Sequence, residues 1–327
     1  MTNFVTKTLQ AGGSIHPLVV PVELGTKGTG LFNPSVYKDG KDLWVNVRHC
    51  QYTIYHAEKG KYEHQWGPLC YLCPEDDLTL TTTNWMCKLN PDFSIKKHYS
   101  VDFSRFNKKP IWEFVGLEDC RLFRWEGKLY LCGVRRDTTP NGQGRMELSE
   151  IQNISGVMTE VSRYRIPTPG DDSSYCEKNW VPILDMPYHF VKWSNPTEIV
   201  KVDMENKVTE QVFLGKHVAP IPYDFRGGSQ VIPFGEYRIT LAHVLTKFFK
   251  TEAGRKNAQY RHAFIVWDKD WNVVKYGDLF DFMGGEIEFC CGMVEHNGNF
   301  LITFGFQDNA AYLLNVPRSV IEGYING

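Results

Sequence analysis

Residues 118–135 have the sequence EDCRLFRWEGKLYLCGVR. Two acidic residues lead into an apolar stretch, a turn at Glu126-Gly127 follows, and a second apolar stretch ends at Arg135. Glycine supplies the backbone angles that a tight turn requires, so the segment predicts a β-hairpin. Its polar residues stand at one end of the hairpin, on both strands.

The same pattern occurs at four other places in the chain. The five units begin near residues 33, 118, 178, 229 and 288, and their turns lie at Asp39-Gly40, Glu126-Gly127, Asp185-Met186-Pro187, Phe234-Gly235 and His296-Asn297-Gly298. A repeat of about fifty to sixty residues that consists of strands without long helices is typical of a β-propeller, with one blade per repeat. The sequence therefore predicts an all-β fold, a five-bladed β-propeller that forms a single domain over residues 1–327.

Segments outside the hairpins complete the predicted fold. The residues before about position 30 show no periodicity and are expected to form an extended lead-in. Segments 78–83 and 95–103 are expected to be outer strands of the first blade, and residues 316–324 the one short helix. The last blade must close the ring, which propellers commonly do by pairing a terminal strand with the first blade.

The repeat also predicts where polar residues meet. The first strand of every blade passes beside the central channel, so equivalent positions converge there. These positions hold Asn33, Glu118, Asp119, Lys178, Asn179, Ser229 and Glu288, and the ends of the second strands add Arg48, Arg135, Lys192 and His243. Clustered charges must be paired or put to use, so we expect a central polar channel that carries an active site. The alternative is a set of ion pairs that only hold the blades in register.

Composition limits the partners and the compartment. A net charge of −2 gives no long-range attraction for polyanions, so nucleic acid is not favoured, although a modified base stays open as an acceptor. No apolar run reaches the length of a membrane span, and the first residues lack a secretion signal. Nine cysteines, an odd number, fit reduced thiols. We expect a cytoplasmic protein that does not bind membranes.

Common cofactor and nucleophile motifs are missing from the sequence. The pair Cys70-x-x-Cys73 lacks a second pair at suitable spacing, so no metal site is predicted. There is no Walker motif, no dinucleotide-binding glycine pattern and no Gly-x-Ser-x-Gly elbow. The segment Gly227-Gly228-Ser229 is either a tight bend or a set of backbone amides for an oxyanion or a phosphate.

Several of these segments resemble a known family. Gly116-Leu117-Glu118-Asp119-Cys120-Arg121-Leu122 resembles the Gly-x-Glu-Asp-Pro-Arg segment of the five-bladed propeller family that contains the β-mannoside phosphorylases and their hydrolytic relatives. Residues 177–182 resemble the Lys-Asn-Trp segment of the same family. Four later segments are similar to propeller modules associated with glycosyltransferases, at residues 226–229, 260–264, 287–292 and 305–310.

The resemblance implies a set of site residues. Asp119 would be the single general acid, and phosphate would attack the anomeric carbon from the opposite face with inversion. Burial beside Glu118 would raise the pKa of this acid, and Arg121 would oppose that shift. The resemblance further implies that Arg135, Lys178 and His243 hold phosphate, with Arg48 and Arg226 as additional candidates. The other expected substrate contacts are Asn33, Arg121, Asn179, Ser229, His262, Glu288 and Asp308.

Four functions follow from this reasoning. Cys120 replaces the family's proline and the later units resemble transferase-associated modules, so the favoured prediction is a nucleotide-sugar glycosyltransferase that acts on a hydroxyl acceptor. The alternatives are an inverting β-mannoside phosphorylase, a hydrolase in which Glu288 or Asp308 is the second carboxylate, and a noncatalytic glycan-binding propeller. No cofactor is expected beyond a nucleotide sugar or phosphate as co-substrate. The sugar, the acceptor and the oligomeric state stay open.

Overall fold

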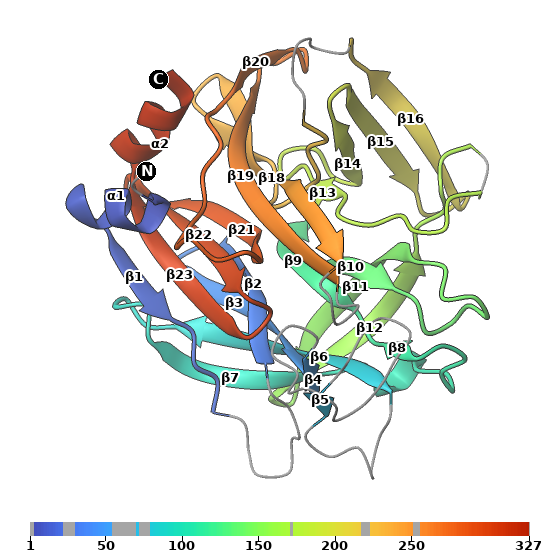
Figure 1. The fold of residues 1–327 in the computed structure, drawn as a ribbon. Helices are drawn as coiled ribbons and strands as arrows, with labels where there is room; N and C mark the ends of the chain where they lie inside the picture. The colour runs from blue at the N-terminus through green and yellow to red at the C-terminus, as the bar shows by residue number, and fades with distance from the viewer. Residues whose placement is uncertain are drawn as a thin grey trace.

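The computed structural model describes residues 3–21, 30–53, 70–71, 79–170, 173–216, 223–250 and 256–326. Over these residues the chain is built mainly from β-strands, which confirms the predicted all-β class. The strands form four-stranded antiparallel units arranged around a common centre, as Figure 1 shows, so the fold is a β-propeller. No helix in the described part of the chain is long and apolar enough to cross a membrane.

The described strands form three four-stranded sheets, one nine-stranded sheet and one two-stranded sheet. Dividing the nine-stranded sheet where two of its strands pair in parallel gives five four-stranded units, which follow one another in the chain. The first unit contains β2 (Gly30–Asp39), β3 (Asp42–Cys50), β6 (Leu80–Leu89) and β7 (Ile95–Asp102). The second contains β9 (Glu118–Trp125), β10 (Lys128–Arg135), β11 (Arg145–Ile154) and β12 (Val157–Arg165). The third contains β13 (Val181–Pro182), β14 (His189–Ser194), β15 (Thr197–Asp203) and β16 (Val208–Leu214). The fourth contains β17 (Ile232–Phe234), β18 (Tyr237–Lys250), β19 (Lys256–Trp267) and β20 (Val273–Tyr276). The fifth contains β21 (Glu288–His296), β22 (Asn299–Phe306), β23 (Ala310–Pro317) and β1 (Ser14–Pro17).

The predicted turns and outer strands are confirmed. The hairpins turn at the predicted positions. Strand β6 begins at Leu80, inside the first segment expected as an outer strand, and β7 covers residues 95–102 of the second. The third and fourth inner strands begin at Val181 and Ile232, which is later than the predicted starts near 178 and 229. The polar residues before these strands, Lys178, Asn179 and Ser229, lie in the preceding connections.

The first and second units are joined edge to edge. Strands β7 and β12 pair in parallel, with Val101 opposite Met158 and Asp102 opposite Thr159. The repeat could not predict this link, since it does not specify which outer strands meet. Two short pairings lie beside the first unit, β8 (Phe114–Val115) with β6 and β4 (Tyr52–Thr53) with β5 (Cys70–Tyr71). Cys73 and the side chain of Cys70 lie outside the described residues.

The N-terminal strand completes the fifth unit. Strand β1 pairs antiparallel with β23, with Ser14 opposite Asn315 and Pro17 opposite Tyr312. Both ends of the chain therefore belong to one sheet, and in Figure 1 the two terminal helices lie beside it. This pairing closes the ring by joining chain segments that are distant in sequence.

The prediction of an extended lead-in is wrong at its start. Helix α1 (Phe4–Gln10) occupies this position, and the Asn3 side chain caps it by accepting the Thr6 backbone N–H at 2.8 Å. Phe4 is fully buried and stacks on Phe280 with ring centroids 4.4 Å apart. Seven residues are too few to form a stable isolated helix, so packing rather than periodicity fixes this element.

The predicted C-terminal helix is present as α2 (Arg318–Asn326), but it is not the only helix. Besides α1, the described residues contain the short 3-10 helix η1 (Ser104–Phe106). Helix α2 buries Ile321 and Tyr324, and the Tyr324 ring lies 5.4 Å from the Phe4 ring. The two terminal helices thus share one aromatic contact surface with the fourth and fifth units.

Apolar side chains fill the interfaces between neighbouring units. Between the second and third units Trp125 and Phe190 meet edge to face at 5.2 Å, and next to the fifth unit Phe282 stacks on Phe304 at 4.1 Å. Burial of one such side chain contributes roughly 1.5–3 kcal/mol. The packing between units therefore holds the inner strands at fixed positions around the centre.

A buried glutamine connects the inner strands of several units. The Gln230 side chain is fully buried, and its amide nitrogen donates to the carbonyl oxygens of Leu122 (2.7 Å) and Val36 (3.2 Å). Its amide oxygen accepts the Met293 backbone N–H at 3.1 Å. One side chain thus satisfies backbone groups of the first, second and fifth units. Gln230 at the centre therefore has a structural role.

Candidate active site

Three residues near the starts of inner strands have unusual backbones. Asn33, Asp119 and Asn179 have φ values of 47°, 50° and 62°. Left-handed backbones of residues other than glycine are uncommon, and such strained residues cluster at functional sites. Although they are 86 positions apart, Asn33 and Asp119 meet, because the Asn33 amide donates to Asp119 Oδ1 at 2.8 Å. The structure therefore brings these two predicted site residues together.

Glycine makes room for Asn33 at this place. A Cβ atom on Gly305 would fall 2.1 Å from Asn33 Oδ1, which is closer than atoms can approach. Gly305 lies in β22 of the fifth unit, beside the start of the first unit. The close approach of these two strands therefore depends on the missing side chain.

Arg48 links the two acidic residues at the start of β9. Its Nη1 lies 2.9 Å from Asp119 Oδ1, and its Nη2 lies 3.3 Å from Glu118 Oε2. Tyr52 and Thr82 accept further hydrogen bonds from the same guanidinium. The Arg48 side chain is only 7% exposed, whereas that of Asp119 is 21% exposed. Asp119 is therefore held by a buried cation and still reaches the surface.

A third carboxyl group joins this cluster from the fifth unit. Asp308 lies in the turn between β22 and β23 and has a left-handed backbone with φ of 48°. Burial raises the pKa of Asp308 to about 7. Arg48 lowers this pKa, whereas Asp119 and Glu118 raise it, and the Asn33 amide also hydrogen-bonds Asp308. Asp308 therefore holds a proton up to nearly neutral pH.

Asp119 has the opposite protonation behaviour. Burial raises the pKa of its carboxyl, but the Arg48 charge and the hydrogen bonds from Asn33 and Arg48 outweigh burial and hold the pKa below its usual value. Near neutral pH the cluster thus contains an ionised Asp119 and an Asp308 that retains its proton. Two carboxyl groups whose pKa values are pushed apart are a common arrangement for acid and base roles.

Arg121 brings a positive charge into the same region. Its guanidinium donates to the carbonyl oxygens of Asp119 (2.8 Å), Gly228 (2.9 Å) and Gly227 (3.2 Å) and to Asn179 Oδ1 (3.2 Å). The residue is 1% exposed, and no carboxylate among the described residues forms an ion pair with it. Carbonyl dipoles hold Arg121 without cancelling its charge. A buried charge of this kind favours an anion nearby.

His243 and Lys178 lie on the Arg121 side of the cluster. The Nδ1 atom of His243 lies 3.0 Å from the Gly227 carbonyl oxygen, which can only accept, so Nδ1 carries the proton. Burial lowers the pKa of His243 well below its usual value, and the charges of His262, Arg121 and Lys178 add to this shift. His243 is therefore neutral, with Nε2 as an acceptor. Lys178 is exposed, and no ion pair joins it to a described carboxylate.

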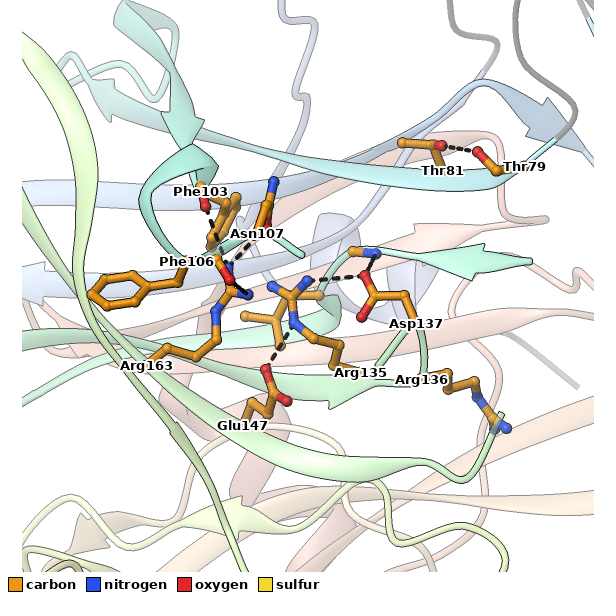
Figure 2. A network of polar contacts seen from close by, with 12 residues as sticks. Thr79, Thr81, Phe103, Phe106, Asn107, Arg135, Arg136, Asp137, Glu147 and Arg163 are labelled. Atoms are coloured by element: carbon orange, nitrogen blue, oxygen red, sulfur yellow. Dashed lines mark hydrogen bonds and ion pairs between the residues drawn. The ribbon is translucent and has the colours of Figure 1, made fainter. Parts of the chain in front are cut away.

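Arg135, a predicted phosphate ligand, has its charge neutralised. Figure 2 shows the buried Arg135 side chain between Asp137 and Glu147. The ion pairs measure 3.1 Å from Arg135 Nη1 to Asp137 Oδ2 and 2.7 Å from Nε to Glu147 Oε2. Asp137 Oδ2 also accepts the Gly116 backbone N–H at 2.9 Å. Arg135 and Asp137 therefore support the turn that precedes Glu118.

Other predicted site residues have local partners instead of joining the cluster. Glu288 is fully buried, and its carboxylate accepts the backbone N–H groups of Phe282, Met283 and Gly285 at 2.6–2.9 Å. Ser229 Oγ accepts the Leu241 N–H at 2.9 Å. The remaining three are Arg226, which pairs with Asp224 at 2.7 Å, Lys192, which lies 3.6 Å from Glu198, and His262, which is fully buried with its ring 4.7 Å from that of Phe282.

Tyr260 is a site residue that the sequence reasoning missed. It lies on β19, and its ring is 5.3 Å from the His243 ring. Burial raises the pKa of Tyr260 to about 12, and the negative charges of Asp308 and Asp119 contribute. Its hydroxyl is therefore a neutral hydrogen-bond donor beside the two carboxyl groups. The repeat gave no signal for Tyr260, because its unit was aligned only by the first two strands.

Comparison of sequences finds no match for this chain. No family model matches it, and no curated protein matches it. Chemistry at the site must therefore be argued from the residues themselves.

Comparison of folds gives matches over nearly the full length. A β-1,2-mannobiose phosphorylase from Listeria innocua, in complex with β-1,2-mannobiose, has a TM-score of 0.58 at 13% identity, covering 95% of this chain and 96% of that one. A glycosyl hydrolase from Bacteroides ovatus has a TM-score of 0.60 at 10% identity, covering 93% and 92%. MPT-4, a mannose phosphorylase from Leishmania mexicana in complex with phosphate ion, has a TM-score of 0.51 at 11% identity, covering 98% and 93%. At such identities the similarity shows a shared fold.

Proposed function

We propose that this protein is an inverting glycoside phosphorylase that acts on β-mannosides. One observation carries the proposal, namely that a protonated and an ionised carboxyl group lie next to a buried arginine with no described carboxylate partner. The two carboxyl groups can supply a proton, and the buried arginine can bind a phosphate. Two proteins with this fold are a mannobiose phosphorylase in complex with β-1,2-mannobiose and a mannose phosphorylase in complex with phosphate ion, which supports the choice of substrates.

The reaction needs one bond made and one broken. A phosphate oxygen attacks the anomeric carbon of the terminal mannose, and the glycosidic C–O bond breaks with its electron pair passing to the leaving oxygen. That oxygen takes a proton from a carboxyl group of the cluster. Because attack comes from the face opposite the leaving group, a β-mannoside yields α-mannose 1-phosphate and a saccharide shorter by one unit.

The proton comes from the Asp119–Asp308 pair. Asp119 is the acid that the sequence predicts, but Arg48 favours its ionised form in the unliganded protein. Asp308 holds the proton there, and the Asn33 amide contacts both carboxyl groups. In this proposal the two residues act as one unit that delivers a single proton.

The phosphate is held by Arg121, Lys178 and His243. Arg121 and Lys178 supply positive charge, and Nε2 of the neutral His243 accepts a hydrogen bond from a phosphate hydroxyl. This set differs from the predicted one in adding Arg121. It omits Arg135, Arg226 and Arg48, each of which pairs with a carboxylate.

The nucleotide-sugar transferase that the sequence favoured has less support. One of its two arguments was Cys120, which replaces a proline, yet this side chain is fully buried and its thiol faces the Leu117 carbonyl oxygen at 3.5 Å. The substitution therefore concerns packing of the strand and not the reacting groups. The three compared proteins are two phosphorylases and a glycosyl hydrolase.

A hydrolase is also less well supported. It would need a carboxylate base to activate water. Glu288 was one candidate, but its oxygens are used by three backbone N–H groups. Asp308 was the other, and it is protonated below about pH 7 and so is not a base there.

Phosphate dependence tests the proposal. Mannose release from β-1,2-mannobiose, followed by ion chromatography, should require inorganic phosphate and rise with its concentration to saturation. Equal release in phosphate-free buffer would show hydrolysis and overturn the proposal. The Lys178→Arg variant should keep the reaction, because it keeps the charge.

A further inference from the structure

A groove lies between the first and second units, far from the acidic cluster. Its lining includes Asp39 at the end of β2 and Gly127 in the turn after β9. Asp119 stands at the other end of β9, so the groove and the cluster are about 25 Å apart at roughly 3.3 Å per strand residue. The groove has a volume of about 380 Å³. This lies within the range of about 300–1,000 Å³ that small-molecule sites occupy.

The groove exists because the first two units are joined. The pairing of β7 with β12 places Val101 opposite Met158, and Met158 lines the groove. The other neighbouring units lack such a pairing between their described outer strands. This feature is therefore specific to one interface and does not follow from the repeat.

The lining of the groove combines one aromatic side chain with several polar and charged ones. Trp44 lines it as a half-buried side chain and is fixed from behind by Tyr99, whose ring centroid is 6.3 Å away, and by Lys88 Nζ at 5.9 Å. The half-buried Leu129 adds apolar surface to the same groove. An aromatic ring held in one orientation suits the C–H face of a sugar ring, because both surfaces are apolar and flat.

The rim of the groove is polar but has no net charge. Arg124 pairs with Asp39 at 2.8 Å, and Lys128 lies 3.6 Å from Glu150. The exposed Gln152 donates to Glu150 Oε1 at 2.9 Å and leaves its amide oxygen as an acceptor. Both donors and acceptors are thus present in the groove that Trp44 lines. An anion would meet as many negative as positive groups, whereas sugar hydroxyls can pair with both kinds.

We propose that this groove is a second saccharide-binding site, which takes a neutral oligosaccharide and is separate from the acidic cluster. Trp44 stacks on one sugar ring, and Gln152, Arg124 and Glu150 bond its hydroxyl groups. A second site holds a long glycan on the protein and raises its local concentration. The proposal does not depend on the reaction at Asp119, since binding here needs no turnover.

The indole N–H signal of Trp44 in a ¹⁵N correlation spectrum tests the proposal directly. Trp44→Phe identifies this signal by its disappearance and keeps an aromatic ring at the position. The protein carries Asp119→Asn, so that the probe is not consumed. The probes are β-1,4-mannotriose, cellotriose and, as an anion, inorganic phosphate. The Trp44 signal should shift saturably with at least one trisaccharide and stay in place with phosphate.

Two further variants locate the binding. Gln152→Ala removes an exposed rim side chain without disturbing the core, and the dissociation constant read from the Trp44 signal should rise three-fold or more. Tyr223→Ala removes a 39%-exposed aromatic outside the groove and should leave that constant unchanged. A Trp44 signal that moves with neither trisaccharide, or that moves with phosphate, would overturn the proposal. If the wild-type protein shows no phosphorolysis and the Trp44 signal still shifts with a trisaccharide, the proposed reaction is refuted but the groove site is supported.

Discussion

Replacement of Asp308 by asparagine should change how protein stability depends on pH. In the folded protein burial raises the pKa of this carboxyl from 3.8 to about 7, with added contributions from Asp119 and Glu118. In the unfolded chain the carboxyl is solvated and loses its proton near its ordinary value. At a pH between these two pKa values, the folded state binds the proton and the unfolded state does not. The free energy of unfolding therefore falls as pH rises.

The size of the effect follows from the shift. The difference of 7 − 3.8 = 3.2 pKa units corresponds to about 4 kcal/mol at 1.36 kcal/mol per unit. From pH 5 to pH 7 the wild-type protein crosses two of these units and should lose about 2.7 kcal/mol from this group alone. Asparagine resembles the protonated acid in shape and charge. The Asp308→Asn variant should therefore not show this loss.

Urea unfolding at several pH values measures the difference. The free energy of unfolding of Asp308→Asn minus that of wild type should grow by about 2–3 kcal/mol between pH 5 and pH 8, with most of the change below about pH 7. Introducing Asp119→Asn into both proteins should reduce this growth, because the charge that helps to raise the Asp308 pKa is removed.

The exposed Asp278 supplies the matched control. Asp278→Asn removes a carboxyl outside the cluster and should track the wild type across the same pH range. A stability difference between Asp308→Asn and wild type that is the same at pH 5 and pH 8 would refute the protonation states on which the proposed mechanism depends.

Three further results are expected. Asp119→Asn should lower kcat by about 10²–10⁴-fold without changing the circular dichroism spectrum, and an unchanged kcat would exclude this residue from the acid pair. Lys178→Ala should raise KM for phosphate by about ten-fold, or about 1.4 kcal/mol, whereas the exposed Lys201→Ala should not, and equal effects of both would remove Lys178 from the phosphate site. Gln230→Leu should lower the free energy of unfolding by at least about 3 kcal/mol, because three buried backbone groups lose their partner, whereas Gln211→Leu on exposed β16 should change it by less than about 0.5 kcal/mol.

The fold was predictable because the signal was repeated. Each hairpin has its own turn residues and begins with polar residues. A wrong strand boundary in one unit therefore did not change the prediction for the whole fold. The structure confirms the turns, the order of the units and the meeting of Asn33 with Asp119. Helix α1 was not predictable in this way, because its stability comes from the contact of Phe4 with residues about 270 positions away.

The site was predictable only in part, because a sequence does not show what neutralises a charge. Arg135 and Lys178 had equal standing as cations, yet the first lies between two buried carboxylates and the second does not. Glu288 and Asp308 were equal candidates for a second carboxylate, but the Glu288 carboxylate already accepts hydrogen bonds from backbone N–H groups. These differences depend on contacts between distant segments, which neither spacing nor composition reports.

The phosphorus NMR spectrum of a reaction mixture tests the central claim most directly. The purified protein is incubated with β-1,2-mannobiose and inorganic phosphate, and the sugar phosphate region is followed over time. The account predicts that the signal of α-mannose 1-phosphate grows as that of inorganic phosphate declines, and that Asp308→Asn slows this growth. Release of mannose with no change in the phosphorus spectrum would contradict the account.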